Sequence, residues 1–274
     1  MSPDRLPVIL VHGWNSHPGA WNRLVSRLDA AGIVSARFDH TGMNGEPMGR
    51  IAAALGAWCT EWRDESGWTG PVDMVCHSVG TCIARYYLEV DDGNARRERV
   101  RQLIGLGPPN TGSALAELFV HPRRGQEVID RLSGVFVPRG YDPATDAIVQ
   151  DVRPGSRFME RLRAAGTRSD IVYRIIVTGN PGEDPAFFPL FEGRTWERLP
   201  DGGFRQTFAG DGIVAHADSV LPGATFDIIP AAPGSNDNLP PPEQFCHISL
   251  TKNPLVMDRI FAYLAGSGDK APGS

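Results

Sequence analysis

Residues 76–80, Cys-His-Ser-Val-Gly, place one small hydroxyl group between two apolar runs. The run before it, residues 71–76, is typical of a buried strand, and the run after it, residues 79–90, is typical of a helix. A serine at such a junction can cap the helix by accepting a backbone hydrogen bond. It can also attack a carbonyl carbon as a nucleophile, provided that a base and an orienting carboxylate lie nearby.

The motif around Ser78 resembles the nucleophile elbow of the α/β-hydrolases, whose pattern is small-x-Ser-x-Gly. Small neighbours are needed because the serine adopts a strained positive φ and the strand and helix pack closely. Cys76 stands where the pattern usually has Gly or Ala. The resemblance favours a nucleophile over a helix cap.

Two further segments carry the same resemblance. Residues 11–15, Val-His-Gly-Trp-Asn, are similar to the His-Gly oxyanion loop of lipases and esterases. The likeness implies that the backbone N–H groups of Trp14 and Val79 stabilise the developing oxyanion. Residues 38–42, Phe-Asp-His-Thr-Gly, resemble the Asp-x-x-Gly turn that follows the next strand in that superfamily.

The order of the triad in α/β-hydrolases is serine, acid, histidine. The Gly-Asp-Gly turn at Asp211 and the segment from His247 into the last helix resemble bacterial lipases and related actinobacterial esterases. The similarity extends from Pro7 to Leu264 and implies a catalytic triad of Ser78, Asp211 and His247.

Other histidines and carboxylates fit these roles less well. His12 belongs to the oxyanion loop, the His77 side chain is expected to point away, and His216 comes too early in the chain order. The remaining histidines, which are His17, His40 and His121, are expected on the surface or in loops. The rival acids are Asp184, Asp218 and Asp237; Asp227 falls within the last predicted strand.

Strands and helices alternate on both sides of this motif. Strands are predicted over residues 7–13, 33–42, 71–76, 100–107, 170–180 and 224–231, and helices over residues 17–32, 49–65, 79–90 and 254–266. The alternation predicts a doubly wound, mostly parallel sheet with helices on both faces. With the resemblance, we expect an α/β-hydrolase fold with a helical cap insertion, in one domain over residues 1–274.

Two segments interrupt the alternation. Residues about 110–168 are predicted to form a helical cap or lid, and residues about 181–210 an irregular, aromatic-rich excursion. The apolar cap residues either complete the core or line an acyl pocket that favours long chains. The candidate pocket residues are Trp14, Phe119, Phe136, Phe187 and Phe188.

Composition narrows the class of partner. The net charge of −5, without a block of like charges, argues against a nucleic-acid partner. The sequence has no apolar run long enough for a transmembrane segment. Because the N-terminus lacks a basic region followed by an apolar leader, we expect a cytoplasmic protein, or a secreted one if a leader has been removed. The four cysteines lack metal-binding spacing and suggest buried thiols, although a disulfide stays open.

The resemblance implies a serine hydrolase that cleaves carboxylic esters, as an esterase or lipase, through an acyl-enzyme. The substrate would be a small-molecule ester or a lipid. Some bacterial lipases of this kind hold calcium through an acidic residue soon after the catalytic histidine, but Ile248, Ser249 and Leu250 follow His247. We therefore expect neither a metal nor an organic cofactor. A thioesterase, lactonase or acyltransferase on the same scaffold stays open, a non-catalytic binding protein is less favoured, and the oligomeric state is unspecified.

Overall fold

The computed structural model describes residues 5–230 and 239–266. Their centre is a six-stranded sheet in the order β2-β1-β3-β4-β5-β8, and every neighbouring pair of strands is parallel. The strands are β1 (Val8–Val11), β2 (Ser35–Phe38), β3 (Val72–His77), β4 (Val100–Leu106), β5 (Val172–Thr178) and β8 (Thr225–Ile229). The predicted doubly wound, mostly parallel sheet is confirmed.

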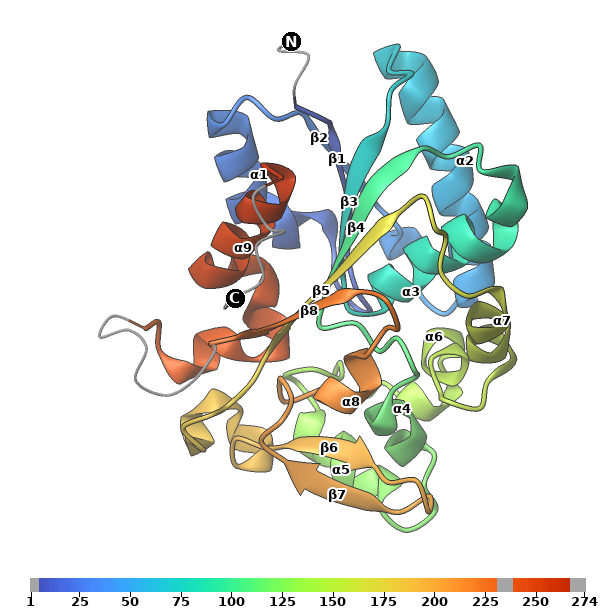
Figure 1. The fold of residues 1–274 in the computed structure, drawn as a ribbon. Helices are drawn as coiled ribbons and strands as arrows, with labels where there is room; N and C mark the ends of the chain where they lie inside the picture. The colour runs from blue at the N-terminus through green and yellow to red at the C-terminus, as the bar shows by residue number, and fades with distance from the viewer. Residues whose placement is uncertain (1–4, 231–238, 267–274) are drawn as a thin grey trace.

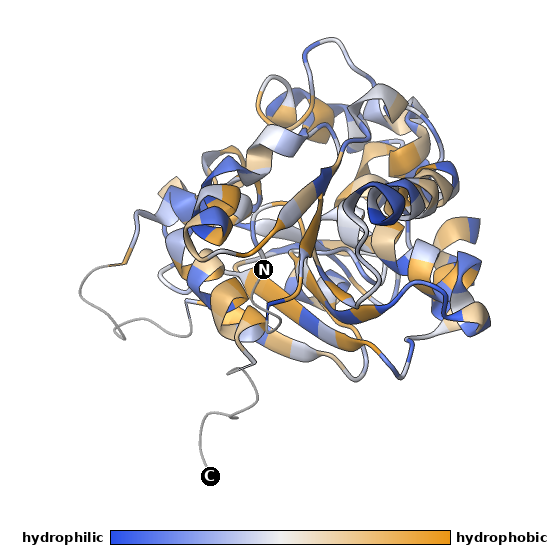
Figure 2. Ribbon diagram, turned by 90° about the horizontal axis from the view of Figure 1, so that it is seen from above, coloured by the Kyte–Doolittle hydropathy of each residue, from blue (hydrophilic) through white to orange (hydrophobic). Residues whose placement is uncertain are grey.

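Helices cover both faces of this sheet (Figure 1). Helices α1 (Asn22–Ala30) and α9 (Pro254–Leu264) lie on one face, and α2 (Met48–Ser66) and α3 (Val79–Arg85) lie on the other. The helix predicted over residues 79–90 continues past α3 as a π-helical segment, Tyr86–Asp91. Figure 2 shows hydrophobic residues concentrated in the strands, whereas the helices carry both hydrophobic and hydrophilic residues.

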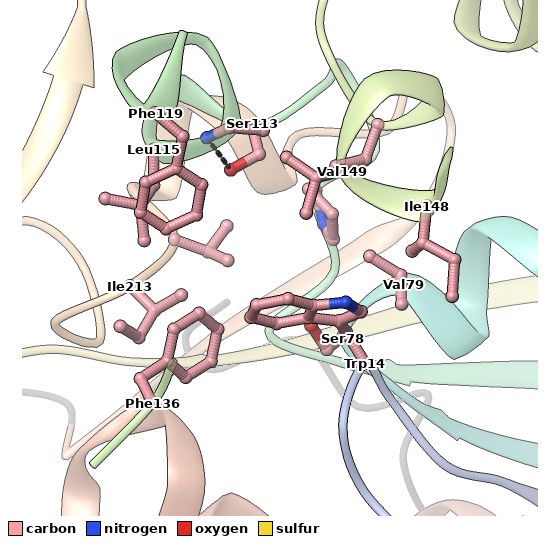
Figure 3. A pocket seen from close by; sticks show the side chains of 14 residues that line it. Trp14, Ser78, Val79, Ser113, Leu115, Phe119, Phe136, Ile148, Val149 and Ile213 are labelled. Carbon is pink, nitrogen blue, oxygen red and sulfur yellow. Dashed lines mark hydrogen bonds between the residues drawn. The ribbon is translucent and has the colours of Figure 1, made fainter. Parts of the chain in front are cut away.

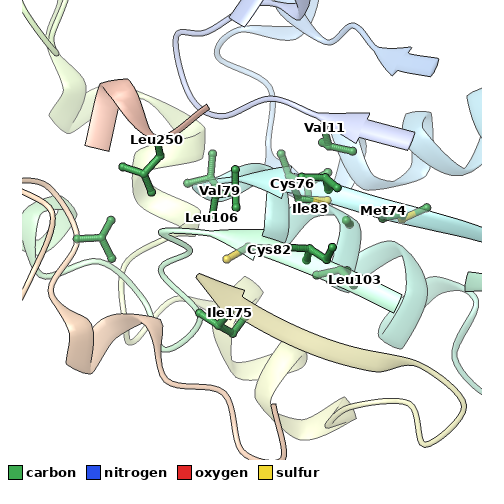
Figure 4. Close-up of a cluster of buried hydrophobic side chains, with 14 of the residues drawn as sticks. Val11, Met74, Cys76, Val79, Cys82, Ile83, Leu103, Leu106, Ile175 and Leu250 are labelled. Atoms are coloured by element: carbon green, nitrogen blue, oxygen red, sulfur yellow. The ribbon is translucent and has the colours of Figure 1, made fainter. Parts of the chain in front are cut away.

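Coverage on both faces explains the composition of the inner strands. All residues of β1 and β3 are buried, so neither strand alternates between a buried and an exposed face: β1 is wholly apolar, and β3 is apolar except for Asp73 and His77. In the core, Met74 and Leu103 from the sheet lie near Ile83 from α3 (Figure 4). This packing fixes the position of the β3–α3 junction that carries Ser78.

Residues 110–168 are mainly helical and lie beyond the carboxyl ends of the strands, below the sheet in Figure 1. They form α4 (Ala114–Phe119), α5 (Gly125–Leu132), α6 (Ala147–Asp151) and α7 (Arg157–Ala165). We call this segment the cap. Many of its apolar side chains, including Leu115 and Val149, are buried, whereas Val135 is exposed.

Residues 181–210 are more regular than the sequence predicts. After two short 3-10 turns they form an antiparallel hairpin of β6 (Thr195–Arg198) and β7 (Phe204–Thr207). The prediction of irregular structure was wrong there, because polar and charged residues dominate both strands and no apolar alternation marks them. Glu197 and Arg205 pair across the hairpin at 2.7 Å.

A buried ion pair joins the sheet-covering helices to the cap. Arg85 in α3 donates to both carboxylate oxygens of Glu89, at 3.0 and 2.9 Å, and to Oδ1 of Asn110 at 3.1 Å. The Asn110 amide in turn donates to the carbonyl of Ser219, at the end of α8 (His216–Ser219). Burial raises the pKa of Glu89, and the charge of Arg85 opposes that rise. Arg85 therefore stabilises the charged form of Glu89 and holds the start of the cap.

Replacing Arg85 with methionine should destabilise the protein by about 3–5 kcal/mol, because the Glu89 carboxylate then stays buried without its partner. The measurement is the free energy of unfolding from urea denaturation. The matched control is the double variant Arg85→Met with Glu89→Leu, which should recover most of the loss since no charge is left buried. A single variant as stable as the wild type would show that this pair does not support the fold.

Candidate active site

Ser78 sits at the junction between β3 and α3 in a strained backbone conformation. Its φ is 55° and its ψ is −133°, a region that residues other than glycine rarely adopt and that costs about 1–3 kcal/mol. Within the described residues its side chain does not cap α3. Instead Oγ lies 2.9 Å from Nε2 of His247. The geometry disfavours the helix-cap interpretation.

Gly80 is required by the same junction. A Cβ atom at this position would lie 2.3 Å from the His12 carbonyl oxygen and 2.8 Å from that of Val11. The end of β1 therefore presses directly on the first turn of α3. Cys76, the residue that departs from the superfamily pattern, is fully buried, and burial raises the pKa of its thiol.

His247 connects Ser78 to Asp211. Its Nδ1 lies 2.7 Å from Oδ2 of Asp211, and its backbone N–H donates to the Asp211 carbonyl at 2.8 Å. All three side chains are buried. Because the carboxylate accepts from Nδ1–H, Nε2 is left free to accept the Ser78 proton. The structure thus brings together the three residues that the sequence analysis proposes.

The turn that carries Asp211 is fixed by its neighbours. Oδ1 of Asp211 accepts from the backbone N–H groups of Ile213 and Val214, at 3.1 and 2.7 Å. The N–H of Gly212 donates to Thr195 Oγ1 at 2.7 Å, and a Cβ at Gly212 would lie 2.7 Å from the Phe188 ring. The glycine is needed because the Phe188 side chain packs directly on the turn.

This packing corrects the sequence prediction for two aromatic residues. Phe187 and Phe188 are both buried and line neither of the two cavities at Ser78 that are described below, contrary to the sequence prediction. Phe188 instead packs on the Asp211 turn.

The rival carboxylates have other partners. Oδ2 of Asp218 accepts from the N–H of Ala114, the first residue of α4, at 2.9 Å. Burial raises the pKa of Asp218 to about 7. Asp184 accepts from the N–H of Ala186 and caps a 3-10 turn. Asp237 lies outside the described residues.

Two histidines are more deeply involved in the structure than predicted. His40 lies in the loop after β2, as the prediction allows, but it is buried and stacks on His12 with the ring centroids 3.7 Å apart. Burial lowers the pKa of both rings, that of His12 to about 4. His77 does not point away: its Nε2 donates to the His247 carbonyl at 3.1 Å. His77 therefore supports the backbone of the proposed base.

The remaining histidines have structural or peripheral positions. His216 Nε2 donates to the carbonyl of Thr178 at 2.8 Å. His17 is exposed and His121 is half-buried, both in connecting segments as predicted.

The loop after β1 passes beside the nucleophile. A Cβ at Gly13 would lie 3.0 Å from Cβ of Ser78, so the loop can approach only because residue 13 is glycine. The Trp14 indole N–H donates to Oδ2 of Asp146 at 3.2 Å, and the Tyr141 hydroxyl also donates to that carboxylate. The loop is thereby attached to the cap. The roles of the Trp14 and Val79 amides as oxyanion donors stay a prediction.

Two cavities meet at Ser78. The first, which we call the acyl-side cavity, has a volume of about 40 Å³ and is almost wholly apolar (Figure 3). The second, which we call the polar cavity, has a volume of about 240 Å³ and includes the His77 and His247 side chains in its walls. Trp14, Ser78 and Phe136 belong to both. The other walls of the acyl-side cavity are Val79, Pro109, Ser113, Leu115, Ala116, Phe119, Ile148, Val149, Val152, Ile213 and Val214.

The described residues contain no cluster of three or more His, Cys, Asp or Glu side chains that could hold a metal ion. Within the same residues, none of the helices combines the length and the apolar character needed to span a bilayer. All four cysteines lie in this part of the chain and are free, buried thiols.

Residues 2–154, just over half of the chain, match the family model described as serine aminopeptidase, S33, a family of α/β-hydrolases. The chain belongs to this family. The resemblance to α/β-hydrolases that the motifs carry is thus confirmed. No curated protein sequence matches this α/β-hydrolase.

Solved structures share its fold at low sequence identity. The mature form of lipase BlEst2 from Bacillus licheniformis is 21% identical with a TM-score of 0.67, over 96% of this chain and 93% of that one. A metagenomic carboxyl esterase is 17% identical with a TM-score of 0.58, over 97% and 77% of the two chains. A monoacylglycerol lipase from Paleococcus ferrophilus is 15% identical with a TM-score of 0.54, over 97% and 96%. The chain covers 52% of the propeptide form of the Bacillus lipase.

Sequence reasoning missed Gly107, which lies beside Asp211 and His247. Gly107 follows β4 with a φ of 55°, and a Cβ there would lie 2.6 Å from Oδ2 of Asp211 and 3.2 Å from Nδ1 of His247. The register of β3 against β4 pairs His77 with Leu106, which places Gly107 beside Ser78. The only sequence signal was a Gly-Pro-Pro stop at the end of the strand.

Replacing Gly107 with alanine should break the hydrogen bond between Asp211 and His247, because the added methyl group occupies the space of the carboxylate oxygen. The measurement is the downfield proton resonance of an imidazole N–H bound to a carboxylate, which should be lost. Gly67→Ala is the matched control: Gly67 ends α2 at a φ of 67° with no atom within 4 Å of its added Cβ. It should cost about 1 kcal/mol of stability and keep the resonance. An unchanged resonance in Gly107→Ala would refute the crowding argument.

Proposed function

We propose that this α/β-hydrolase is a serine esterase that cleaves carboxylic esters with short acyl chains through an acyl-enzyme. The observation that carries the proposal is the continuous hydrogen-bonded chain from Ser78 through His247 to Asp211, buried at a strained strand-to-helix junction. Ser78 keeps a positive φ because the end of β1 packs closely against Gly80. Strained backbone of this kind at a non-glycine residue is typical of functional sites.

In the first half of the reaction, His247 Nε2 takes the proton of the Ser78 hydroxyl as its oxygen attacks the ester carbonyl. The backbone N–H groups of Trp14 and Val79 donate to the oxyanion of the tetrahedral intermediate. His247 then gives its proton to the departing alcohol oxygen as the carbon–oxygen bond breaks, and the acyl group stays on Ser78. Asp211 holds the imidazole orientation and stabilises the imidazolium form.

In the second half, water replaces the alcohol. His247 removes a proton from the attacking water, the same amides bind the second oxyanion, and the proton returns to Ser78 as the carboxylic acid leaves. These steps need no metal or organic cofactor.

The acyl-side cavity sets the acyl specificity. Its volume of about 40 Å³ is the smaller of the two volumes at Ser78. The sequence analysis expects a cap that favours long acyl chains, whereas the narrowness of this cavity favours short ones. We therefore assign it to acetyl through butyryl groups.

The chemistry of the two cavities also favours esters over peptides. An aminopeptidase must bind the substrate ammonium group near the bond that it cleaves, and a carboxylate is the usual partner of an ammonium ion. Among the described residues, no Asp or Glu side chain lines either cavity. The lipases and esterases among the solved structures of the same fold support the same choice. Thioesters and lactones would follow the same steps and stay alternative substrates.

Replacing Ser78 with alanine should abolish both labelling by a fluorophosphonate probe and turnover of p-nitrophenyl acetate. Asp211→Asn should lower kcat by about 10⁴-fold, since the amide favours the wrong imidazole tautomer. Asp218→Asn is the matched control and should keep nearly full activity, because Asp218 caps α4 and does not orient His247. Persistent labelling in Ser78→Ala would show that Ser78 is not the nucleophile. Loss of activity in Asp218→Asn but not in Asp211→Asn would show that Asp218 is the acid of the triad.

Among p-nitrophenyl esters, kcat/KM should be highest between acetate and butyrate and should fall from hexanoate onward. Phe119→Ala should enlarge the acyl-side cavity and shift the optimum to a longer chain, with each buried methylene worth up to about 0.8 kcal/mol. Val135→Ala is the control, because Val135 lines only the polar cavity. A kcat/KM that rises steadily through decanoate in the wild type would show that the cap opens and that the enzyme is a lipase.

A further inference from the structure

The polar cavity differs in chemistry from the acyl-side cavity. Its side chains include Asn15, Ser16, His17, Thr251 and Lys252, and none of its wall residues is an Asp or Glu. Its volume of about 240 Å³ exceeds that of the acyl-side cavity, which is about 40 Å³. The absence of carboxylates from the walls of this cavity contrasts with the net charge of −5 of the whole protein.

The position of His247 assigns this cavity to the alcohol part of the ester. His247 lines the polar cavity and is not in the walls of the acyl-side cavity. Because His247 Nε2 must protonate the leaving oxygen, the alcohol has to depart on the side where this ring is accessible. This step rests on the proposed function, since it takes Ser78 as the nucleophile and His247 as its base.

Lys252 supplies positive charge at the edge of the cavity. The sequence has only two lysines, and Lys252 is the one within the described residues. The 3-10 helix that begins at His247 ends at Lys252, so one short element carries both the proposed base and the ammonium group. Among the described residues no carboxylate pairs with Lys252. Arg23, whose guanidinium donates to the Lys252 carbonyl at 3.4 Å, adds a second positive charge nearby.

Other walls of the cavity offer hydrogen-bond donors. His17 Nδ1 accepts from the N–H of Gly19 at 3.1 Å, which places the proton of a neutral ring on Nε2. That N–H, the Ser16 hydroxyl and the Asn15 amide are all donors on walls of the polar cavity. Donors around an unpaired ammonium group suit an anionic oxygen group.

We propose that the polar cavity binds the alcohol portion of the ester and that Lys252 selects alcohols that carry a carboxylate or a phosphate. Lys252 acts on specificity and does not take part in bond making. The substrate class is thus a short-chain ester of an anionic alcohol.

The test compares acetyl esters whose leaving groups have similar size and differ in charge. The probes are 4-acetoxybenzoate and 4-acetoxyphenyl phosphate, with 4-acetoxybenzamide as the neutral reference. In the wild type, kcat/KM for each anionic ester relative to the neutral one should be about fivefold higher than in Lys252→Gln. Lys252→Arg should keep the preference and Lys252→Glu should invert it. The preference should weaken as salt concentration rises.

Arg50→Gln is the matched control, because Arg50 is an exposed cation in α2 that does not line the polar cavity. It should leave all ratios unchanged. A preference for only one of the two anionic esters assigns the carboxylate or the phosphate as the recognised group. Equal ratios in the wild type and Lys252→Gln, with normal turnover of the neutral ester, would overturn the role of Lys252 and leave the proposed function intact.

Binding separates the two proposals further. Ser78→Ala cannot turn over the esters, so calorimetry on this variant measures their affinity alone. It should bind 4-acetoxybenzoate about fivefold more tightly than the double variant Ser78→Ala with Lys252→Gln does. Absence of turnover in the wild type would refute the esterase assignment, whereas equal affinities in these two variants would refute anion recognition.

Discussion

The site depends on one steric constraint, the contact between the carbonyl of His12 and the backbone of Gly80. The end of β1 and the start of α3 are so close that only glycine fits, and this closeness forces Ser78 into its positive-φ turn. The same approach sets the loop of Gly13 and Trp14 beside the hydroxyl. Two reciprocal hydrogen bonds hold that loop: the His40 backbone N–H donates to His12 Nε2 at 3.3 Å, and His40 Nε2 donates to the His12 carbonyl at 3.0 Å, with the two rings stacked.

The features that the sequence revealed are those with a local chemical signature. The elbow, the Gly-Asp-Gly turn and the histidine before the last helix each combine a reactive side chain with small neighbours, and the alternation of apolar runs located the parallel sheet. Features that depend on contacts between residues far apart in the sequence could not be predicted. The burial of His40 arises from stacking on a residue 28 positions away. Residue 107 must be glycine because the Asp211 side chain lies against it. The two residues are far apart in the sequence, so this contact could not be predicted. The β6–β7 hairpin is polar on both strands and gave no periodic signal.

The cap covers Ser78 and also holds the loop that follows β1. Asp146 begins α6, with Oδ1 accepting from the N–H of Ile148 at 2.7 Å, and its other oxygen accepts from Trp14 and Tyr141. One carboxylate thus fixes both a helix of the cap and the loop beside the nucleophile. Phe136, whose ring centroid lies 5.3 Å from that of Trp14 and 6.1 Å from that of His247, stands between the two cavities. Trp14, bonded to Asp146, and Phe136 thus form walls that the two cavities at Ser78 share.

The hydroxyl and the imidazole of the site are 169 residues apart along the chain. Closing a loop of that length has an entropic cost that local contacts do not offset, so such contacts form late in folding. During synthesis on the ribosome, the strand and helix around Ser78 can fold long before His247 is made. The contact between Ser78 and His247 can form only after the segment before α9 has been made and has packed against the sheet.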